Sequence, residues 1–147
     1  MARLEITTGT DELAEDLRKL RDISDEDAFE ILTPAAETLA EKFQENIRSV
    51  FTQRTGKLAA AIQSFRKVTD GPHILIYPDG PHHRYRSRKT KGTKTATAAE
   101  VGFVLEYGSN RVKASHWMEN TVNETEAEIG EKIQEGFDSF CDARGIP

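Results

Sequence analysis

One apolar pattern, between residues 36 and 51, restricts the fold of this chain more than any other feature. Its members recur at helical spacing: Ala36, Leu39, Ala40, Phe43, Ile47, Val50 and Phe51. Such a stripe predicts an amphipathic helix that buries one face against another element. Thr33-Pro34 has the order of an N-cap and a first helical residue, so Pro34 is expected to open this helix or to kink one that starts earlier. Ser24, with Asp27 three residues later, marks that earlier start.

A second long helix is predicted over residues 115–143, with Ser115 as its N-cap. Its apolar side chains share one face: Met118, Val122, Ile129, Ile133, Phe137 and Phe140. Trp117 is interpreted as a packing anchor, and the acidic residues of this segment as a solvated face. Cys141 is the only cysteine, which excludes an intrachain disulfide and fits a reducing cytosol.

The residues between the two helices indicate extended chain. Segments 60–69 and 73–78 flank the turn signal Asp70-Gly71-Pro72, which predicts a β-hairpin. Segment 100–107 is apolar and fits either a third, buried strand or a short helix ended by Gly108. We therefore expect one α+β domain over 1–147, in which a small antiparallel sheet packs against helices 34–51 and 115–143.

Charge is unevenly distributed along the chain. The first 53 residues carry six Lys and Arg against 13 Asp and Glu; residues 54–98 carry ten against two, and residues 99–147 carry four against ten. Within the basic part, segment 82–98 has no acidic residue and few apolar ones, so a long mobile loop is expected there. Its cations are Arg84, Arg86, Arg88, Lys89, Lys91 and Lys94.

This basic segment has three interpretations. It is a solvated loop without a role, a contact strip for nucleic acid phosphates, or a surface that docks on the acidic helices of a neighbouring copy. We favour the third interpretation, because the chain itself supplies both signs of charge.

Motifs typical of enzymes are missing from the sequence: it contains no GxSxG, P-loop, HExxH or CxxC pattern. His82-His83 is the one local pair that suggests a metal or a general base, and it lies in the expected loop. We therefore expect no catalytic residue, metal ligand or cofactor. No apolar run approaches the roughly 20 residues of a membrane span, and no secretory signal is expected.

Three short blocks resemble a known family when they are taken in order. They are Arg54-Thr55-Gly56-Lys57-Leu58, Glu106-Tyr107-Gly108-Ser109 and Ala114-Ser115-His116-Trp117-Met118. Their order resembles the tail-completion, or minor tail-component, family of bacteriophages, with its R-T-G-x-L-x-x-S-I, h-E-h-G-T and A-x-P-F-h blocks. The chain departs from that pattern at Ala61, at Ser109 and at His116-Trp117, and its basic segment 82–98 is longer.

The resemblance implies a structural virion protein at the phage neck, assembled in the cytoplasm of the bacterial host. It implies a homo-oligomeric ring, a hexamer by family, that contacts the tail tube and the head-side connector or stopper proteins and leaves a channel for DNA. A small nucleic-acid-binding module, with residues 84–94 as its contact strip, is the alternative. The positions matched to the family blocks are Arg54, Thr55, Gly56, Leu58, Glu106, Gly108 and Trp117. Glu106 is expected to pair with Arg54 or Lys57.

Overall fold

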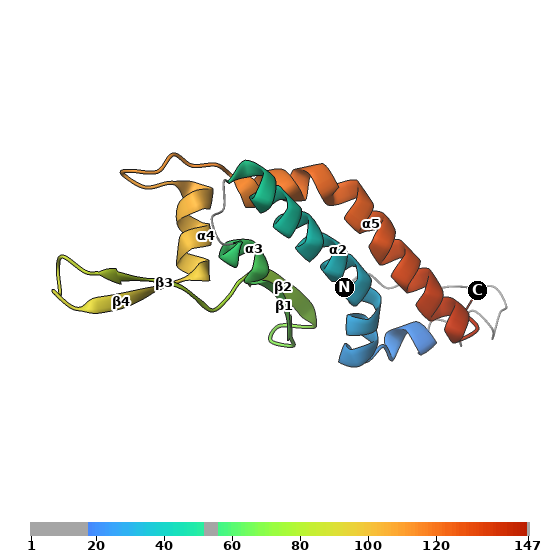
Figure 1. Ribbon diagram of the computed structural model, residues 1–147. Coiled ribbons are helices and arrows are strands. Elements are labelled where there is room, and N and C mark those ends of the chain that lie inside the picture. The colour runs from blue at the N-terminus through green and yellow to red at the C-terminus, as the bar shows by residue number, and fades with distance from the viewer. Residues whose placement is uncertain (1–17, 52–55, 147) are drawn as a thin grey trace, which may run out of the picture.

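The computed structural model describes residues 18–51 and 56–146. Two long helices, α2 (Asp25–Val50) and α5 (Trp117–Ala143), lie side by side and run in opposite directions (Figure 1). The segment that joins them holds two β-hairpins and two shorter helices. The elements are α3 (Lys57–Ala60), β1 (Ile62–Lys67), β2 (His73–Pro78), β3 (Pro81–Arg86), β4 (Thr93–Thr97) and α4 (Ala98–Tyr107). The predicted α+β class is confirmed.

Helix α2 begins at the capping signal that the sequence contains. The Ser24 side chain accepts the N–H of Asp27 at 3.2 Å, and the Asp27 carboxylate accepts the N–H of Ser24 at 2.9 Å. Hydrogen bonds from the Ser24 backbone and then from its hydroxyl hold the pKa of Asp27 below its ordinary value, and the nearby Arg144 guanidinium also lowers it. Because Arg144 follows the end of α5, this ion pair joins the start of one long helix to the end of the other.

Of the two alternatives for Pro34, the opening of a new helix is wrong: α2 is continuous from Asp25 to Val50 and contains Pro34, so the helix starts earlier, at the Ser24 cap. Proline has no N–H to donate within the helix. Neighbouring hydroxyls add local bonds, since Thr33 donates to the Phe29 carbonyl at 2.6 Å and Thr38 donates to the Pro34 carbonyl at 3.0 Å. Burial of Phe29 extends the apolar face of α2 upstream of the proline.

The core lies where α2, α3, β1 and the first turns of α4 and α5 meet. Its buried residues are Phe43, Ile47, Leu58, Ala59, Ile62, Ala98 and Trp117. The Trp117 ring stands edge-on to the Phe43 ring, with 5.6 Å between centroids, and its indole N–H donates to the Gly102 carbonyl at 3.2 Å. The predicted packing role of Trp117 is confirmed.

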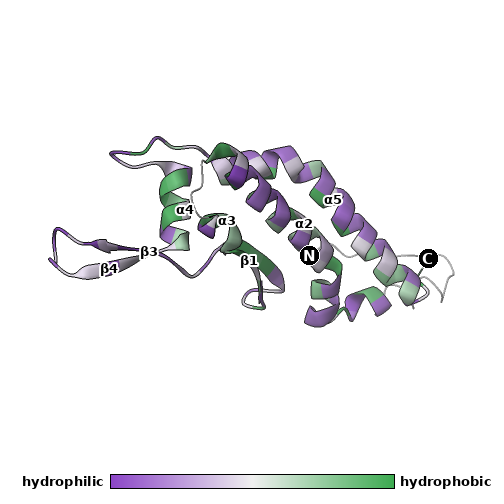
Figure 2. Cartoon of the chain, viewed as in Figure 1, coloured by the Kyte–Doolittle hydropathy of each residue, from purple (hydrophilic) through white to green (hydrophobic). Residues whose placement is uncertain are grey.

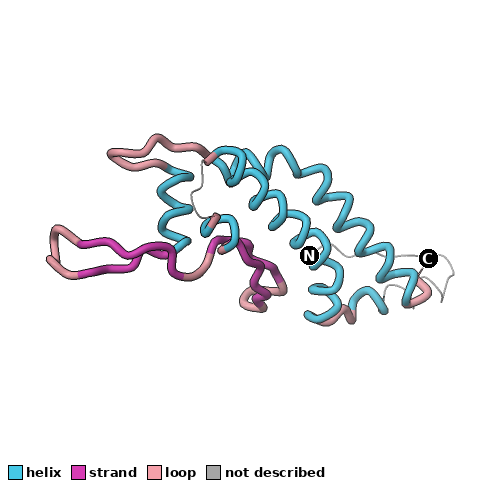
Figure 3. The backbone as a smooth tube through the Cα atoms, in the orientation of Figure 1, coloured by secondary structure: helices cyan, strands magenta, loops and turns pink. Residues whose placement is uncertain are grey.

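The strands form two separate two-stranded sheets and not one sheet (Figure 3). The predicted hairpin over 60–78 is confirmed: β1 and β2 pair antiparallel, with Ile62 opposite Pro78 and Lys67 opposite His73. Gly71 supplies a φ of 105° in the turn between them. This hairpin packs against α2.

Segment 100–107 is helical, so the third strand of the expected sheet is absent there. Thr97 and Glu100 form a capping box that starts α4: the Thr97 hydroxyl accepts the N–H of Glu100, and the Glu100 carboxylate accepts the N–H of Thr97. Gly108, with a φ of 81°, ends this helix as predicted. A Cβ at this position would lie 2.8 Å from the Ala114 nitrogen, so Gly108 also permits the close return of the chain.

Two glycines of α5 give a matched pair of substitutions. A Cβ at Gly136 would lie 2.5 Å from the carbonyl oxygen of Ile31 in α2, whereas a Cβ at Gly130 would meet nothing within 4 Å. We expect Gly136→Ala to lower the free energy of unfolding by about 1–3 kcal/mol, because the two helices must move apart. Gly130→Ala is expected to raise it by about 1 kcal/mol through helix propensity. Urea denaturation followed by far-UV circular dichroism measures both, and equal gains would contradict this helix–helix geometry.

Candidate assembly interface

The basic segment 82–98 contains regular structure, so the expectation of a loop without secondary structure is wrong. Strands β3 and β4 pair antiparallel, with Arg84 opposite Thr95 and Tyr85 opposite Lys94, and a bulge interrupts the register near Pro81. The hairpin projects away from the two long helices (Figure 1). Almost all of its side chains are exposed on both faces. A two-stranded hairpin with no core of its own is marginally stable in water, so a partner surface would stabilise it.

This hairpin brings together the six cations singled out in the sequence. Arg84 and Arg86 lie on β3 and Lys94 on β4, while the other three, Arg88, Lys89 and Lys91, lie in the turn between the strands. All six are exposed, and none forms an ion pair with another residue of the described ranges. We call residues 81–97 the basic hairpin.

An apolar groove lies at the base of the basic hairpin, between it, α4 and the loop that follows α4. The groove has a volume of about 560 Å³. Its lining residues are His83, Tyr85, Ala96, Glu100, Val101, Val104, Leu105 and Val112. Because strand residues directly opposite each other share a face, Lys94 lies on the same face of the hairpin as Tyr85. The groove-facing side of the hairpin is therefore partly aromatic and partly basic.

Helix α4 is apolar on almost every side (Figure 2), a composition typical of a buried helix. Yet Phe103 and Tyr107 are each 63% exposed, on a face of α4 that does not line the groove, and their ring centroids are 4.7 Å apart. Large apolar side chains that are exposed side by side are typical of an interaction site. The groove and this aromatic pair make α4 a candidate contact element.

The outer surface of the two long helices has the opposite charge. Helix α2 contains seven Asp and Glu against two Lys and Arg, and α5 contains eight against one. Lys42 reaches Glu45 at 3.7 Å and Glu128 at 3.9 Å, and Lys132 reaches Glu135 at 3.0 Å. We call this surface of α2 and α5 the acidic helix pair.

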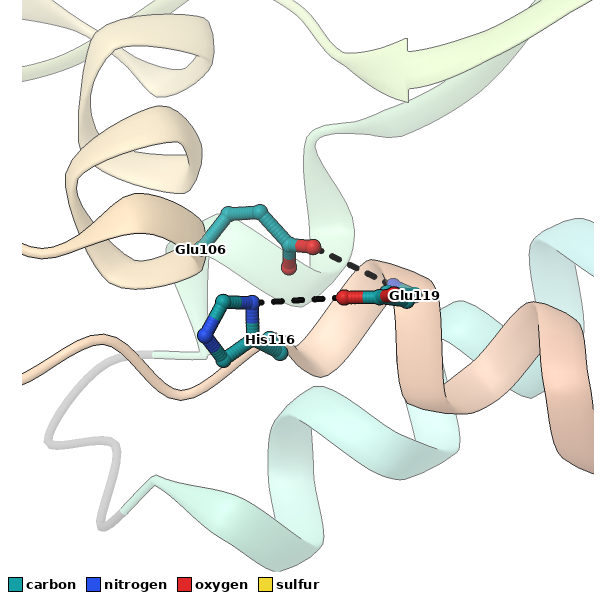
Figure 4. A group of neighbouring side chains, drawn as sticks. All are labelled: Glu106, His116 and Glu119. Carbon is teal, nitrogen blue, oxygen red and sulfur yellow. Dashed lines mark hydrogen bonds and ion pairs between the residues drawn. The ribbon is translucent and has the colours of Figure 1, made fainter.

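Glu106 and two neighbours form a cluster at the start of α5 (Figure 4). Glu106 is 4% exposed, and its carboxylate accepts the N–H groups of Met118 at 2.7 Å and of Glu119 at 3.2 Å. His116, at the N-cap with a φ of 52°, makes no side-chain capping bond, and its Nδ1 lies 3.3 Å from a Glu119 oxygen. Glu106 thus caps α5 from another helix.

One expectation about this region is wrong, and a second is tested for only one of its two alternatives. Ser115 does not cap α5, because its hydroxyl donates to the Leu105 carbonyl at 2.6 Å. Glu106 forms no ion pair with Lys57 among the described residues, since its oxygens accept the backbone N–H groups of α5. Arg54, its other expected partner, lies outside the described residues, as does Thr55.

The ligand atoms of Glu106, His116 and Glu119 lie within 4.8 Å of one another, which is a spacing at which a divalent cation binds. The carboxylate of Glu106 is already engaged by two N–H groups at the positive end of a helix dipole. The cluster is therefore interpreted as a cap that fixes the contact between α4 and α5.

The remaining family-block positions have structural roles. Gly56 has a φ of 63° and precedes α3, a backbone conformation that favours glycine. Leu58 is buried in the core at 5% exposure.

The pair His82 and His83 lies at the base of the basic hairpin with 2.8 Å between the two Nδ1 atoms. Partial burial lowers the pKa of His82, and the positive charges of His83 and Lys57 lower it further.

Comparisons with known proteins give no relative. No family model matches the chain, no curated protein matches it, and no solved structure matches it. Within the described ranges, no helix is both long enough and apolar enough to cross a bilayer. The resemblance to the phage family therefore depends on the sequence blocks alone, and the function that it implies is a proposal.

Proposed function

We propose that this protein is a structural virion protein of a bacteriophage neck. It forms a ring that completes the tail and joins it to the head-side connector, and the ring leaves a channel for DNA. The observation that carries this proposal is the basic hairpin, which projects from the body with no core of its own beside an exposed apolar helix. Such surfaces are stabilised when a partner covers them.

The function needs complementary surfaces and no chemical reaction. The long helices and the shared core form the body of each subunit, and the hairpin and α4 supply exposed contact surface. In the ring, one surface meets the tail tube protein and another meets the connector or stopper protein. The hexameric state is taken from the family that the sequence resembles.

The test is assembly of the full chain, alone and with the tail tube and connector proteins encoded beside it. We expect rings with a central hole in negative-stain images and a matching mass by light scattering. Neutralising the basic hairpin with Arg84→Gln, Arg86→Gln and Lys94→Gln should abolish rings or tail joining. Lys67→Gln, at an exposed cation of β1, is the control and should leave assembly unchanged. A wild-type chain that stays monomeric in every mixture would contradict the proposal.

A nucleic-acid-binding module is the second candidate function, favoured by six cations without an acid on one arm. It predicts affinity for duplex DNA that falls by orders of magnitude between about 50 and 200 mM salt, because phosphate contacts release counterions. Fluorescence anisotropy with a labelled duplex measures this. The same neutralised variant should lose the affinity while the wild-type chain remains monomeric.

A further inference from the structure

Two surfaces of opposite charge lie on different parts of the molecule. The basic hairpin extends to one side, while α2 and α5 extend to the other (Figure 1). The hairpin contacts α4 within its own chain. In a single subunit the six cations and the acidic helix pair therefore lie apart, and their complementarity is available only to another molecule.

The acidic helix pair has acidic residues that are not engaged in ion pairs within the described part of the subunit and are available for such a contact. Its three cations are Lys42, Arg48 and Lys132. Glu37, Glu41 and Glu131 are exposed and form no ion pair within the described ranges. A basic surface placed there would meet an excess of negative charge, which favours association and fixes its register.

The apolar groove is continuous with the basic hairpin, because His83, Tyr85 and Ala96 belong to both. A partner that binds the groove-facing side of the hairpin therefore also covers Val101 and Val104 of α4. Two further exposed cations, Arg111 and Lys113, flank the groove residue Val112 in sequence. The occupant of this groove is thus expected to be acidic.

We propose that the basic hairpin and its groove bind the acidic helix pair of a second copy of this chain. This inference rests on the proposed function and names the partner of the hairpin. The contact joins two different surfaces, so it is heterologous. Repeated by each subunit in turn, such a contact closes into a ring if the rotation between subunits allows it, and otherwise runs on as a filament.

Charge reversal tests the contact from both sides. One variant carries Arg86→Glu and Lys94→Glu on the hairpin, and a second carries Glu131→Lys and Glu135→Lys on α5; all four positions are exposed. Each variant alone should self-associate about tenfold or more weakly than wild type, because like charges then face each other. A mixture of the two variants, or one chain with all four changes, should recover association. Analytical ultracentrifugation measures it, and circular dichroism checks that each variant is folded.

The outcomes separate this inference from the proposed function. Loss in each variant with recovery in the mixture supports it. If rings form with phage partners but hairpin reversal leaves self-association unchanged, this contact is wrong while the neck function stands. Loss without recovery in the mixture also overturns the contact. A wild-type chain that remains monomeric with phage partners and binds duplex DNA through the hairpin overturns both proposals.

Discussion

Replacing Trp117 by alanine is expected to lower the free energy of unfolding by about 3–5 kcal/mol. The side chain is 1% exposed and lies in the core cluster that joins α2, α3 and α5. Truncation removes its edge-on contact with Phe43 and leaves a cavity that the surrounding helices fill only in part. It also leaves the Gly102 carbonyl without its indole donor. We expect this to be among the largest single effects in the chain.

Trp117 is the only tryptophan, so urea denaturation must be followed by far-UV circular dichroism. Trp117→Phe keeps much of the packing but loses the N–H, and should fall between the wild type and the alanine variant. Val122→Ala, five residues further along the same helix at a 45% exposed position, is the control and should stay within about 0.5 kcal/mol of wild type. A loss below about 1 kcal/mol in Trp117→Ala would show that this residue does not hold the core together.

The long helix α2 and the β1–β2 hairpin were predictable because the sequence patterns that mark them are local. The stripe through Phe43 and Ile47 indicates a buried helical face, and both residues are buried. The turn at Asp70 and Gly71 separates two β-rich runs, and β1 and β2 pair there. Thr33-Pro34 has the form of a helix start, but the Ser24–Asp27 capping box upstream begins the helix.

The basic hairpin was missed for a physical reason. A strand that buries one face shows alternating apolar residues, whereas β3 and β4 expose both faces and pair through their backbones. The prediction that the cations from Arg84 to Lys94 form one basic segment is nevertheless consistent with the structure, because they lie together on one hairpin. Helix α4 was ambiguous because an apolar run fits either element; the Thr97–Glu100 capping pattern was the signal that distinguishes them.

The cap of α5 was beyond local sequence reasoning. Ser115 is a residue type that commonly caps a helix, and it stands just before α5. The acceptor for the first N–H groups of α5 is instead a carboxylate from α4, and a loop separates the two helices. Only the tertiary structure brings the Glu106 carboxylate to the N–H groups of Met118 and Glu119. The sequence blocks singled out Glu106 and predicted a pair with Arg54 or Lys57, but they did not indicate that its carboxylate accepts N–H groups at the start of α5.

Glu106→Ala is expected to lower the free energy of unfolding by about 2–3 kcal/mol. The substitution leaves two partly buried N–H groups of α5 without their acceptors and removes a negative charge from the positive end of the helix dipole. Glu106→Gln keeps one oxygen and should lose about 1–2 kcal/mol. Glu126→Ala, at an exposed position of α5, is the control and should change stability by less than about 0.5 kcal/mol.

Hydrogen exchange distinguishes the loss of this cap from general destabilisation. In Glu106→Ala, the amides of Met118 and Glu119 should exchange faster than the global change in stability explains, while the amide of Phe43 in α2 should follow the global change. Glu106 also links α4 to α5 through these hydrogen bonds. Their loss would increase the mobility of α4 and of the groove that α4 lines. Self-association of folded Glu106→Ala should then weaken along with its stability. Normal protection at Met118 and Glu119 would show instead that α5 starts without help from Glu106.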